Sequence, residues 1–353
     1  MKTFLEVVQE TDFRKKAQKI LSLGTAHPFY SFKNTFPILY RYRALSEYTL
    51  NDIINQKITT SRVGNFNDIY DGAMQIYNTD KECYSAAKSD YKRHTYDFAT
   101  RNSIKAKKEF LAASSFHYKR RSLRYLHYLD NLDFSVACFS SKNNSTLMWA
   151  HYADSNKGLC IGYNFNDLTQ NSILRKIIFP VAYSKHPIKL SKLFDDKVKK
   201  RVPYPYDTAA LCTALCKANC WEYENEWRLV FDSSHDSKNS EYISYPYKVN
   251  INIILFGFHF LKNFFYCKSD NIAKEESKKR LGRFLKLLEY MIINDIEAGI
   301  MLPKANSFNM QTKKVDPRCL KNFISGQFQN NEPEYSHYFY TIQERFWIWL
   351  SKH

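Results

Sequence analysis

The chain has 353 residues, of which 44% are apolar and 16% aromatic, so it can bury a substantial core and is not a disordered protein. Only 9 Gly and 10 Pro residues are present, which argues against a propeller or another fold built from many tight turns. The net charge of +17 attracts polyanions, nucleic acid above all, although a basic surface kept for solubility gives the same count.

The location of the protein is predicted from its start, its apolar runs and its cysteines. Residues 1–16 carry three acidic residues and no long apolar core, so we expect no signal peptide. The longest apolar run, at 253–261, is too short to cross a bilayer. Eight cysteines without compact spacing are typical of a reducing compartment. We therefore expect a cytoplasmic protein that makes no contact with a membrane.

Hydrophobic periodicity predicts short strands among longer helices. In chain order, we expect helices at 3–23, 46–56, 79–130, 146–153, 208–220, 272–293 and 334–350, and strands at 38–43, 57–62, 134–140, 158–165, 180–183, 227–231 and 251–260. Ser46 is the expected N-cap of the second helix. The strands at 38–43, 134–140, 158–165 and 227–231 are expected to share one sheet, with the last two helices packed outside it.

This pattern predicts an α+β fold with a central mixed or antiparallel sheet and added helices. We divide the chain into an N-terminal helical extension at 1–37, an α+β domain carrying the site at 38–260, and a C-terminal helical part at 261–353.

Four sequence blocks stand out: LYRYR at 39–43, FNDIYDG at 66–72, CFS at 138–140 leading to MWAHYA at 148–153, and WEYENEWR at 221–228. In this order and spacing they resemble a widespread bacterial family of unknown function, over roughly residues 38–260. The chain departs from the family pattern at Ile69, commonly Pro, and at Tyr70, commonly Phe. These departures alter the rigidity of the loop and leave its polar groups in place.

Glu224 and Glu226 are the sharpest chemical feature of these blocks. Residues two apart on a strand share a face, so both carboxylates are expected to point into one cleft. This Glu-x-Glu pair resembles that of mono-ADP-ribosyltransferases, and it implies an ADP-ribosyltransferase-like sheet and NAD as a substrate. Breaking the nicotinamide–ribose bond develops an oxocarbenium-like ribose, which a carboxylate stabilises while another carboxylate orients or deprotonates the attacking group.

The same resemblance implies an Arg on the first core strand and a Ser in a middle strand, in the chain order of Arg41, Ser140 and Glu226. It assigns catalysis to Glu226, Glu224 and Ser140. The residues expected to bind NAD are Tyr40, Arg41, Tyr42, Asn67, Asp68, His151 and Tyr152.

Structural roles remain open for several of these residues. Glu226 can pair with Arg228, and Arg41 can pair with Asp68 or Asp71. Asn67 and Asp68 also suit a simple turn. Trp149 fits a core position, while His151 suits either a core or a site.

Metal and nucleotide motifs are scarce in the sequence. Cys212, Cys216 and Cys220 recur every four residues, which predicts a buried stripe on one helix face and no metal site. No P-loop, Rossmann glycine fingerprint or His-Glu-x-x-His motif occurs.

A basic segment at 101–124 carries aromatic residues between its charges, the combination that single-stranded nucleic acid requires. We expect nucleic-acid contacts from Lys119, Arg120, Arg121 and Arg124.

The function predicted from these features is NAD-dependent ADP-ribosylation of nucleic acid, RNA in particular. By analogy with toxins of that fold, it suits a phage-defence toxin with a neutralising antitoxin partner. One alternative is a nucleic-acid-binding effector without catalysis, in which the Glu pair is structural. The other is a nuclease in which Asp68, Asp71, Glu224 and Glu226 hold Mg²⁺.

Overall fold

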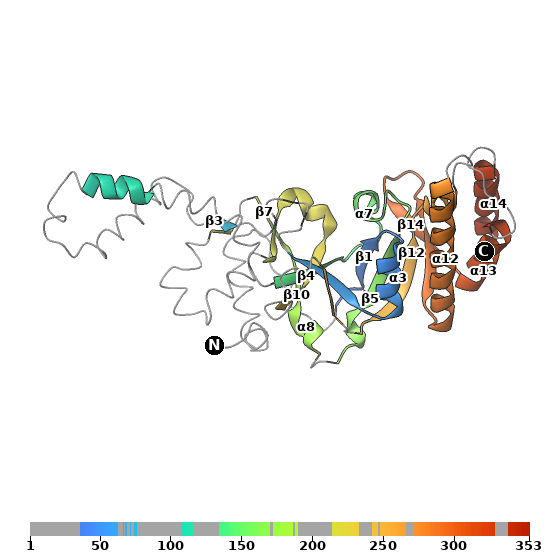
Figure 1. Ribbon diagram of the computed structural model, residues 1–353, viewed down its shortest axis with the longest axis horizontal. Helices are drawn as coiled ribbons and strands as arrows, with labels where there is room; N and C mark the ends of the chain where they lie inside the picture. The colour runs from blue at the N-terminus through green and yellow to red at the C-terminus, as the bar shows by residue number, and fades with distance from the viewer. Residues whose placement is uncertain are drawn as a thin grey trace.

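A computed structural model describes the part of the chain discussed below (Figure 1). The described residues are 36–62, 66, 68, 71, 74–75, 107–115, 134–169, 172–185, 188–189, 214–232, 242–245, 248–265, 271–328 and 338–353. The predicted helix at 3–23 lies outside them, as does most of the predicted helix at 79–130, of which 107–115 is described and helical.

A ten-stranded sheet is the centre of the fold. Its main path runs in the order β11 (Tyr242–Tyr245), β2 (Ile58–Arg62), β4 (Phe134–Ser140), β1 (Leu39–Arg43), β5 (Leu159–Asn164), β12 (Asn250–Phe256), β13 (Glu297–Pro303) and β14 (Met310–Val315). From β4 a branch leads to β10 (Glu226–Asp232) and β6 (Ile178–Pro180). Only β12 and β13 pair in parallel within this sheet. The sheet is therefore mixed, which confirms the predicted α+β class.

Two small parallel pairs and several helices complete the described fold. The pairs are β3 (Met74–Gln75) with β8 (Ile188–Lys189), and β7 (Ala182–Ser184) with β9 (Cys216–Ala218). Besides the helix at 107–115, the described α-helices include α3 (Glu47–Ile54), α7 (Thr146–Tyr152), α8 (Ile173–Ile177), α12 (Asn271–Ile293), α13 (Pro317–Phe328) and α14 (Tyr338–Lys352). Short 3-10 helices are η3 (Phe165–Asp167), η4 (Asn219–Glu224) and η5 (Phe260–Phe264).

The sheet forks at β4. One edge of β4 is paired along its whole length with β10. The other edge is shared, because β1 pairs with it at Ser140 while β2 pairs with it at Ser135 and Val136. Beyond β4, one branch continues through β1 to β14 and the other ends at β11. The fork leaves an opening between β1 and β2.

Helix α3 makes the connection between these two strands. Ser46 is its N-cap, and its hydroxyl accepts a hydrogen bond from the Thr49 amide at 3.2 Å. Glu47 lies in the first turn, where an acidic group favours the helix dipole. Leu50 and Ile53 face the sheet and are fully buried. The predicted cap and helix are confirmed.

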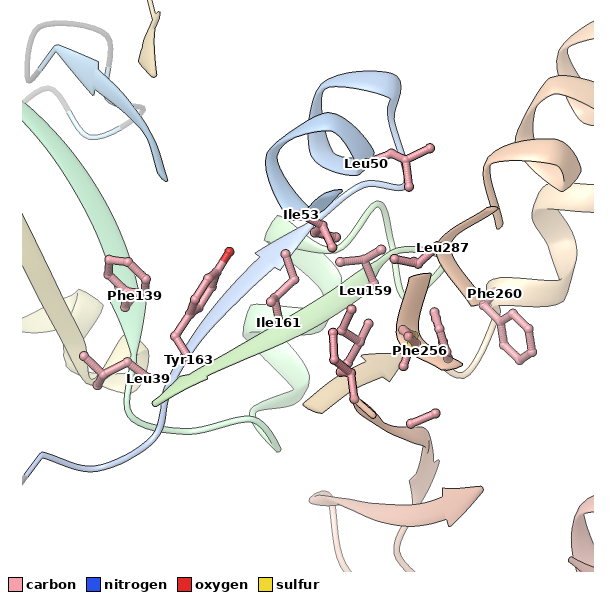
Figure 2. Close-up of a cluster of buried hydrophobic side chains, with 14 of the residues drawn as sticks. Leu39, Leu50, Ile53, Phe139, Leu159, Ile161, Tyr163, Phe256, Phe260 and Leu287 are labelled. Carbon is pink, nitrogen blue, oxygen red and sulfur yellow. The ribbon is translucent and has the colours of Figure 1, made fainter. Parts of the chain in front are cut away.

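Helices cover both faces of the sheet, so its central strands are buried on both sides. Leu39, Ile161 and Phe256 contribute to the core beneath α3 and α12 (Figure 2). Their strand neighbours, among them Cys160 and Leu255, belong to a second cluster with α7 on the opposite face. Because both faces are covered there, Ile254, Leu255 and Phe256 at the end of β12 are buried in succession, whereas the first half of the strand alternates.

The C-terminal part contains more strand than expected. We predicted residues 261–353 as helical, yet β13 and β14 extend the sheet there, with α13 packed on α12. The run from Ala298 to Leu302 is short and follows directly after a long helix, which hides it from a search for period-two alternation. Helix α14 does pack outside, with Ile342, Phe346 and Leu350 buried.

Two other boundaries also differ from expectation. Strand β12 ends at Phe256, because the chain then turns, with the Phe260 amide donating to the Gly257 carbonyl. The helix predicted at 208–220 is wrong for its described part, where β9 and η4 lie. Backbone groups there bond outward to another strand, since Ala182 donates to the Leu215 carbonyl. Cys216 and Cys220 therefore do not share a helix face.

Among the residues that the structure covers, no helix combines the length and the apolar character that crossing a bilayer requires.

The close approach of two backbone segments at Gly158 can be tested by substitution. An alanine methyl at Gly158 would meet the Arg43 carbonyl oxygen at 2.2 Å, and backbone cannot move aside cheaply. We expect Gly158→Ala to lower the free energy of unfolding by about 1–3 kcal/mol, measured by urea denaturation. Gly282→Ala is the control, because that glycine lies within α12 with open space around it. It should raise stability by about 0.5–1 kcal/mol. Equal effects in the two variants would contradict the close approach.

Candidate functional site

A cleft of about 350 Å³ opens where the sheet forks. It is lined by residues of β1, β2, β4 and β10, with further side chains from η4, α7 and β9. Of the residues proposed from the sequence, it brings together Tyr40, Arg41, Tyr42, Ser140, Tyr152, Glu224 and Glu226. These come from three of the four sequence blocks, and Asp71 and Phe66 add the fourth.

Arg228 is the most completely bonded side chain of the cleft. Its exposed fraction is 0%, and each of its five N–H groups has a partner. Two donate to the Asp71 carboxylate, at 2.7 and 2.6 Å, and two to the Glu226 carboxylate, at 2.8 and 3.0 Å. The fifth donates to the Ala214 carbonyl at 2.7 Å. The ring of Phe66 lies 5.1 Å from the guanidinium carbon. Arg228 is thus a structural cation that joins separate chain segments.

Lys217 reaches the same carboxylates from β9. Its Nζ lies 2.5 Å from a Glu224 oxygen, 3.2 Å from a Glu226 oxygen and 3.6 Å from an Asp71 oxygen. Burial disfavours its charged form, yet the surrounding carboxylates raise the pKa of the Lys217 ammonium above its usual value. Sequence reasoning missed this residue, because the segment was predicted as a helix and a lone lysine between cysteines carries no signal.

Glu224 does not occupy the strand position that the Glu-x-Glu spacing predicts. It ends η4, and Asn225 between the two glutamates adopts a left-handed conformation with φ of 46°. Glu226 then starts β10. Both carboxylates still enter the cleft, because both bond to Lys217. The shared site is therefore set by a tight turn and a common cation.

The two carboxylates have opposite electrostatic environments. Burial raises the pKa of the Glu224 carboxyl, and Lys217 offsets that rise only in part. Its other oxygen accepts a hydrogen bond from the Tyr152 hydroxyl at 2.7 Å. Burial also disfavours ionisation of Glu226, but Arg228 and Lys217 outweigh it and lower its pKa to about 2. When two neighbouring carboxyls have pKa values shifted in opposite directions, the one with the raised pKa is suited to carry a proton and the other stays an anion.

Arg41 is a further buried cation of the cleft, and Asp52 offsets its charge only in part. Its side chain is buried, with an exposed fraction of 8%, and lies over the Phe139 ring at 5.3 Å. One guanidinium nitrogen donates to the Thr59 carbonyl at 2.9 Å and so links β1 to β2 across the fork. Burial and repulsion from Arg43 lower the pKa of Arg41 to about 10, so it stays charged at neutral pH. Asp71, one of the partners expected for Arg41, is bound to Arg228 instead.

Ser140 lines the cleft but has its hydroxyl engaged. Its Oγ donates to the Glu224 carbonyl at 2.6 Å and accepts from the Lys142 amide at 3.1 Å. These bonds hold the turn that carries Glu224 against the end of β4. The geometry gives Ser140 a positioning role and leaves its hydroxyl turned away from chemistry.

The remaining proposed residues separate into three groups. His151 is exposed on α7 and does not line the cleft, and Asp68 also lies outside its lining. Trp149 is fully buried, as a core position requires. Beyond the described residues lie Asn67, Lys119, Arg120, Arg121 and Arg124, together with Cys212. Among the described residues, no group of three or more His, Cys, Asp or Glu side chains is arranged to hold a metal ion.

The comparison with protein families covers the centre of this site. Residues 148–229 match the family described as protein of unknown function, DUF2971. This match runs from α7 to β10 and confirms, over that range, the expected relation to a family of unknown function. The DUF2971 region includes Tyr152, Lys217, Glu224, Glu226 and Arg228, whereas Arg41 and Asp71 lie before it. No curated protein and no solved structure matched the chain.

Removing the Asp71 carboxylate tests the network around Arg228. Asp71→Asn keeps the shape but takes one anion from a fully buried guanidinium. We expect a loss of about 3–5 kcal/mol in the free energy of unfolding, by chemical denaturation. Glu297→Gln is the control, since Glu297 pairs with Lys314 through side chains 56% and 70% exposed, and it should cost no more than about 1 kcal/mol. A similar loss in both variants would contradict the structural role of the network.

The depressed pKa of Glu226 predicts an acid-dependent loss of stability. Its folded value of about 2 lies below the ordinary 4.5, so its contribution is complete above pH 4.5 and is lost as the pH falls towards 2. The shift corresponds to about 3 kcal/mol. Unfolding free energies measured from pH 7 downward should fall less steeply in Glu226→Gln than in wild type. The exposed Glu222 gives the control: Glu222→Gln should keep the wild-type slope, and matching slopes for all three proteins would refute the assignment.

Proposed function

We propose that this protein binds NAD in the cleft of the forked sheet and transfers ADP-ribose to nucleic acid, RNA in particular. The observation that carries the proposal is that the cleft is bipolar. Arg41, a buried arginine whose charge Asp52 offsets only in part, lines the cleft together with two carboxylates whose pKa values are driven apart. The expected trio of Arg41, Ser140 and Glu226 lines this one cleft, and we include the ADP-ribosyltransferase-like fold in the proposal on that ground.

The cationic end suits the pyrophosphate of the dinucleotide. Arg41 uses one N–H in a described hydrogen bond and keeps the others for a ligand. Arg43, two residues along β1, also lines the cleft. A guanidinium fork matches phosphate oxygens in geometry as well as charge. Tyr40 and Tyr42 also line the cleft, from the opposite face of β1.

The anionic end suits a developing ribose cation. Asp71, Glu224 and Glu226 contribute three negative charges and Lys217 and Arg228 two positive ones, which leaves one net negative charge when all are ionised. In the proposed step the bond between ribose C1′ and the nicotinamide nitrogen breaks, and nicotinamide leaves with the bonding pair. The net negative charge stabilises the oxocarbenium-like ribose that forms.

The surroundings of the two glutamates support a different role for each, in line with the roles expected from the sequence. Glu226 has both oxygens bound by cations, so it acts as a fixed anion through the network. Glu224, with its raised pKa, is the better proton acceptor. An acceptor O–H or N–H attacks C1′, its proton passes to Glu224, and the products are ADP-ribosylated acceptor and nicotinamide.

One observation favours the alternative without catalysis. The sequence left open a structural role for Glu226 as the partner of Arg228. The two side chains do form this ion pair, at 2.8 Å. A protein that binds nucleic acid and uses this network only for stability would bind RNA without consuming NAD. Nicotinamide release separates the two functions.

The decisive variant is Glu224→Gln, which keeps the shape of the side chain and removes its basicity. With labelled NAD and total RNA, we expect transfer of label to fall by about two to four orders of magnitude while NAD affinity changes little. In wild type, activity should decline as acid protonates Glu224, at a pH above the ordinary range of a glutamate, because its pKa is raised. The variant should lose that acidic limb.

Glu222→Gln serves as the matched control, since Glu222 lies on the same short helix and faces solvent. It should retain wild-type transfer. Absence of nicotinamide release by wild type, with and without nucleic acid, would refute the transferase. Full activity in Glu224→Gln would refute the assigned base.

A further inference from the structure

Helix α7 is followed by a strained turn that begins two residues after Tyr152. Asp154, Ser155 and Asn156 all have a positive φ, of 47°, 54° and 66°. Residues other than glycine enter this left-handed region singly, because their Cβ atom then crowds the following carbonyl oxygen. Three of them in succession store backbone strain. Such strain persists only where the surroundings hold the chain, and it gathers at functional sites.

Contacts from two directions hold this turn. The Asn156 amide donates to the Trp149 carbonyl of α7 at 3.1 Å, and the Asn156 carbonyl accepts from the His259 amide at 2.9 Å. A methyl group at Gly257 would meet that same carbonyl oxygen at 2.2 Å. Trp149 is itself fully buried, and its ring nitrogen donates to the Asn143 carbonyl at 2.7 Å. The place at which α7 ends is therefore fixed by the chain before it and by the segment after β12.

Tyr152 is the side chain that this helix end places in the cleft. Its ring packs against the buried cluster that contains Trp149, and it lines the cleft. Its hydroxyl donates to Oε1 of Glu224 at 2.7 Å, while Lys217 donates to Oε2 at 2.5 Å. Glu224 is only 3% exposed, so water contributes little to its solvation. Among the described residues, Tyr152 is thus the neutral donor and Lys217 the charged donor to this carboxylate.

We propose that Tyr152 is a positioning residue, whose hydroxyl holds Glu224 in place and favours its ionised form, instead of the NAD contact expected from the sequence. A hydroxyl bonds more strongly to a carboxylate than to a neutral carboxyl, so the bond lowers the pKa of its acceptor. It thereby opposes the burial that raises the pKa of Glu224. Glu224 then accepts a proton over a wider range of pH. The part that this plays in transfer rests on the proposed function, whereas the effect on Glu224 does not.

Other titratable groups also surround Glu224 and act on its protonation. Lys217 lowers the pKa of Glu224, and Glu226 raises it. Burial raises the pKa of the Tyr183 and Tyr223 hydroxyls, so both stay neutral in the range where a carboxyl titrates. The groups come from β9, β10, β7 and η4, and the network continues through Lys217 to Asp71 and through Glu226 to Arg228. Tyr152→Phe leaves all of them in place, so it isolates the contribution of one hydroxyl.

The protonation of Glu224 can be followed directly by carboxyl NMR on the full chain, labelled with ¹³C in its glutamate side chains. The Glu224 signal is identified by its absence in Glu224→Gln. In Tyr152→Phe, its titration midpoint should rise by about one to two pH units, the effect of losing a hydrogen bond to a charged group. Tyr223→Phe is the matched control, because Tyr223 adjoins Glu224 in the chain while the described donors to the carboxylate are Tyr152 and Lys217. It should keep the wild-type midpoint.

Transfer of label from NAD gives the second readout. The acidic limb of the pH profile should move to higher pH in Tyr152→Phe, by the same amount as the NMR midpoint. At a pH above that limb, turnover should approach the wild-type value and the KM for NAD should be unchanged, because the hydroxyl acts through Glu224.

Three outcomes would overturn the inference: an NMR midpoint that does not move in Tyr152→Phe, an equal shift in Tyr223→Phe, or a raised KM for NAD with the acidic limb unmoved. The last would return Tyr152 to NAD binding. If wild type releases no nicotinamide while the Glu224 midpoint still depends on Tyr152, the transferase fails and the positioning role stands. Nicotinamide release with a midpoint indifferent to Tyr152 removes the positioning role alone.

Discussion

The guanidinium of Arg228 has no contact with water, and its five N–H groups are divided among Asp71, Glu226 and a backbone carbonyl. A buried cation is stable only when it is paired and fully hydrogen-bonded, so these partners must come to it. Asp71 follows β2 and Ala214 precedes β9 in the chain. Glu226 starts β10, the strand that also carries Arg228. The site is assembled around this requirement, and Lys217 then brings Glu224 into the same network.

The fork of the sheet determines where a ligand can enter. Because β1 and β2 share one edge of β4, their backbones separate and the space between them is lined by side chains of both. Arg41 crosses that space to the Thr59 carbonyl. The two arginines differ in their hydrogen bonds: every N–H of Arg228 donates to a protein acceptor, whereas Arg41 makes one described hydrogen bond and lines the cleft.

Much of the fold could be predicted from local patterns, and much of the site could not. The strand at Phe134–Ser140 and the helix capped by Ser46 agree with expectation, since a short run without charged residues and a cap are both read from near neighbours in the chain. The four sequence blocks also indicated which segments would meet. Lys217 could not be found in this way, because its role depends on pairing with β7 and on carboxylates from other segments. The strands β13 and β14 were hidden by their position after a long helix.

The sequence by itself determined that the chain is basic, that it forms a mixed α+β domain, and that arginine, serine and glutamate fall in a suggestive order. Only the tertiary structure decided what each polar group does. Glu224 and Glu226 are chemically identical and two residues apart, yet one is buried with partial compensation and the other is held between two cations. The pKa of a carboxyl depends on desolvation and on charges a few ångströms away, and those neighbours come from distant parts of the chain. Spacing along the sequence cannot supply that information.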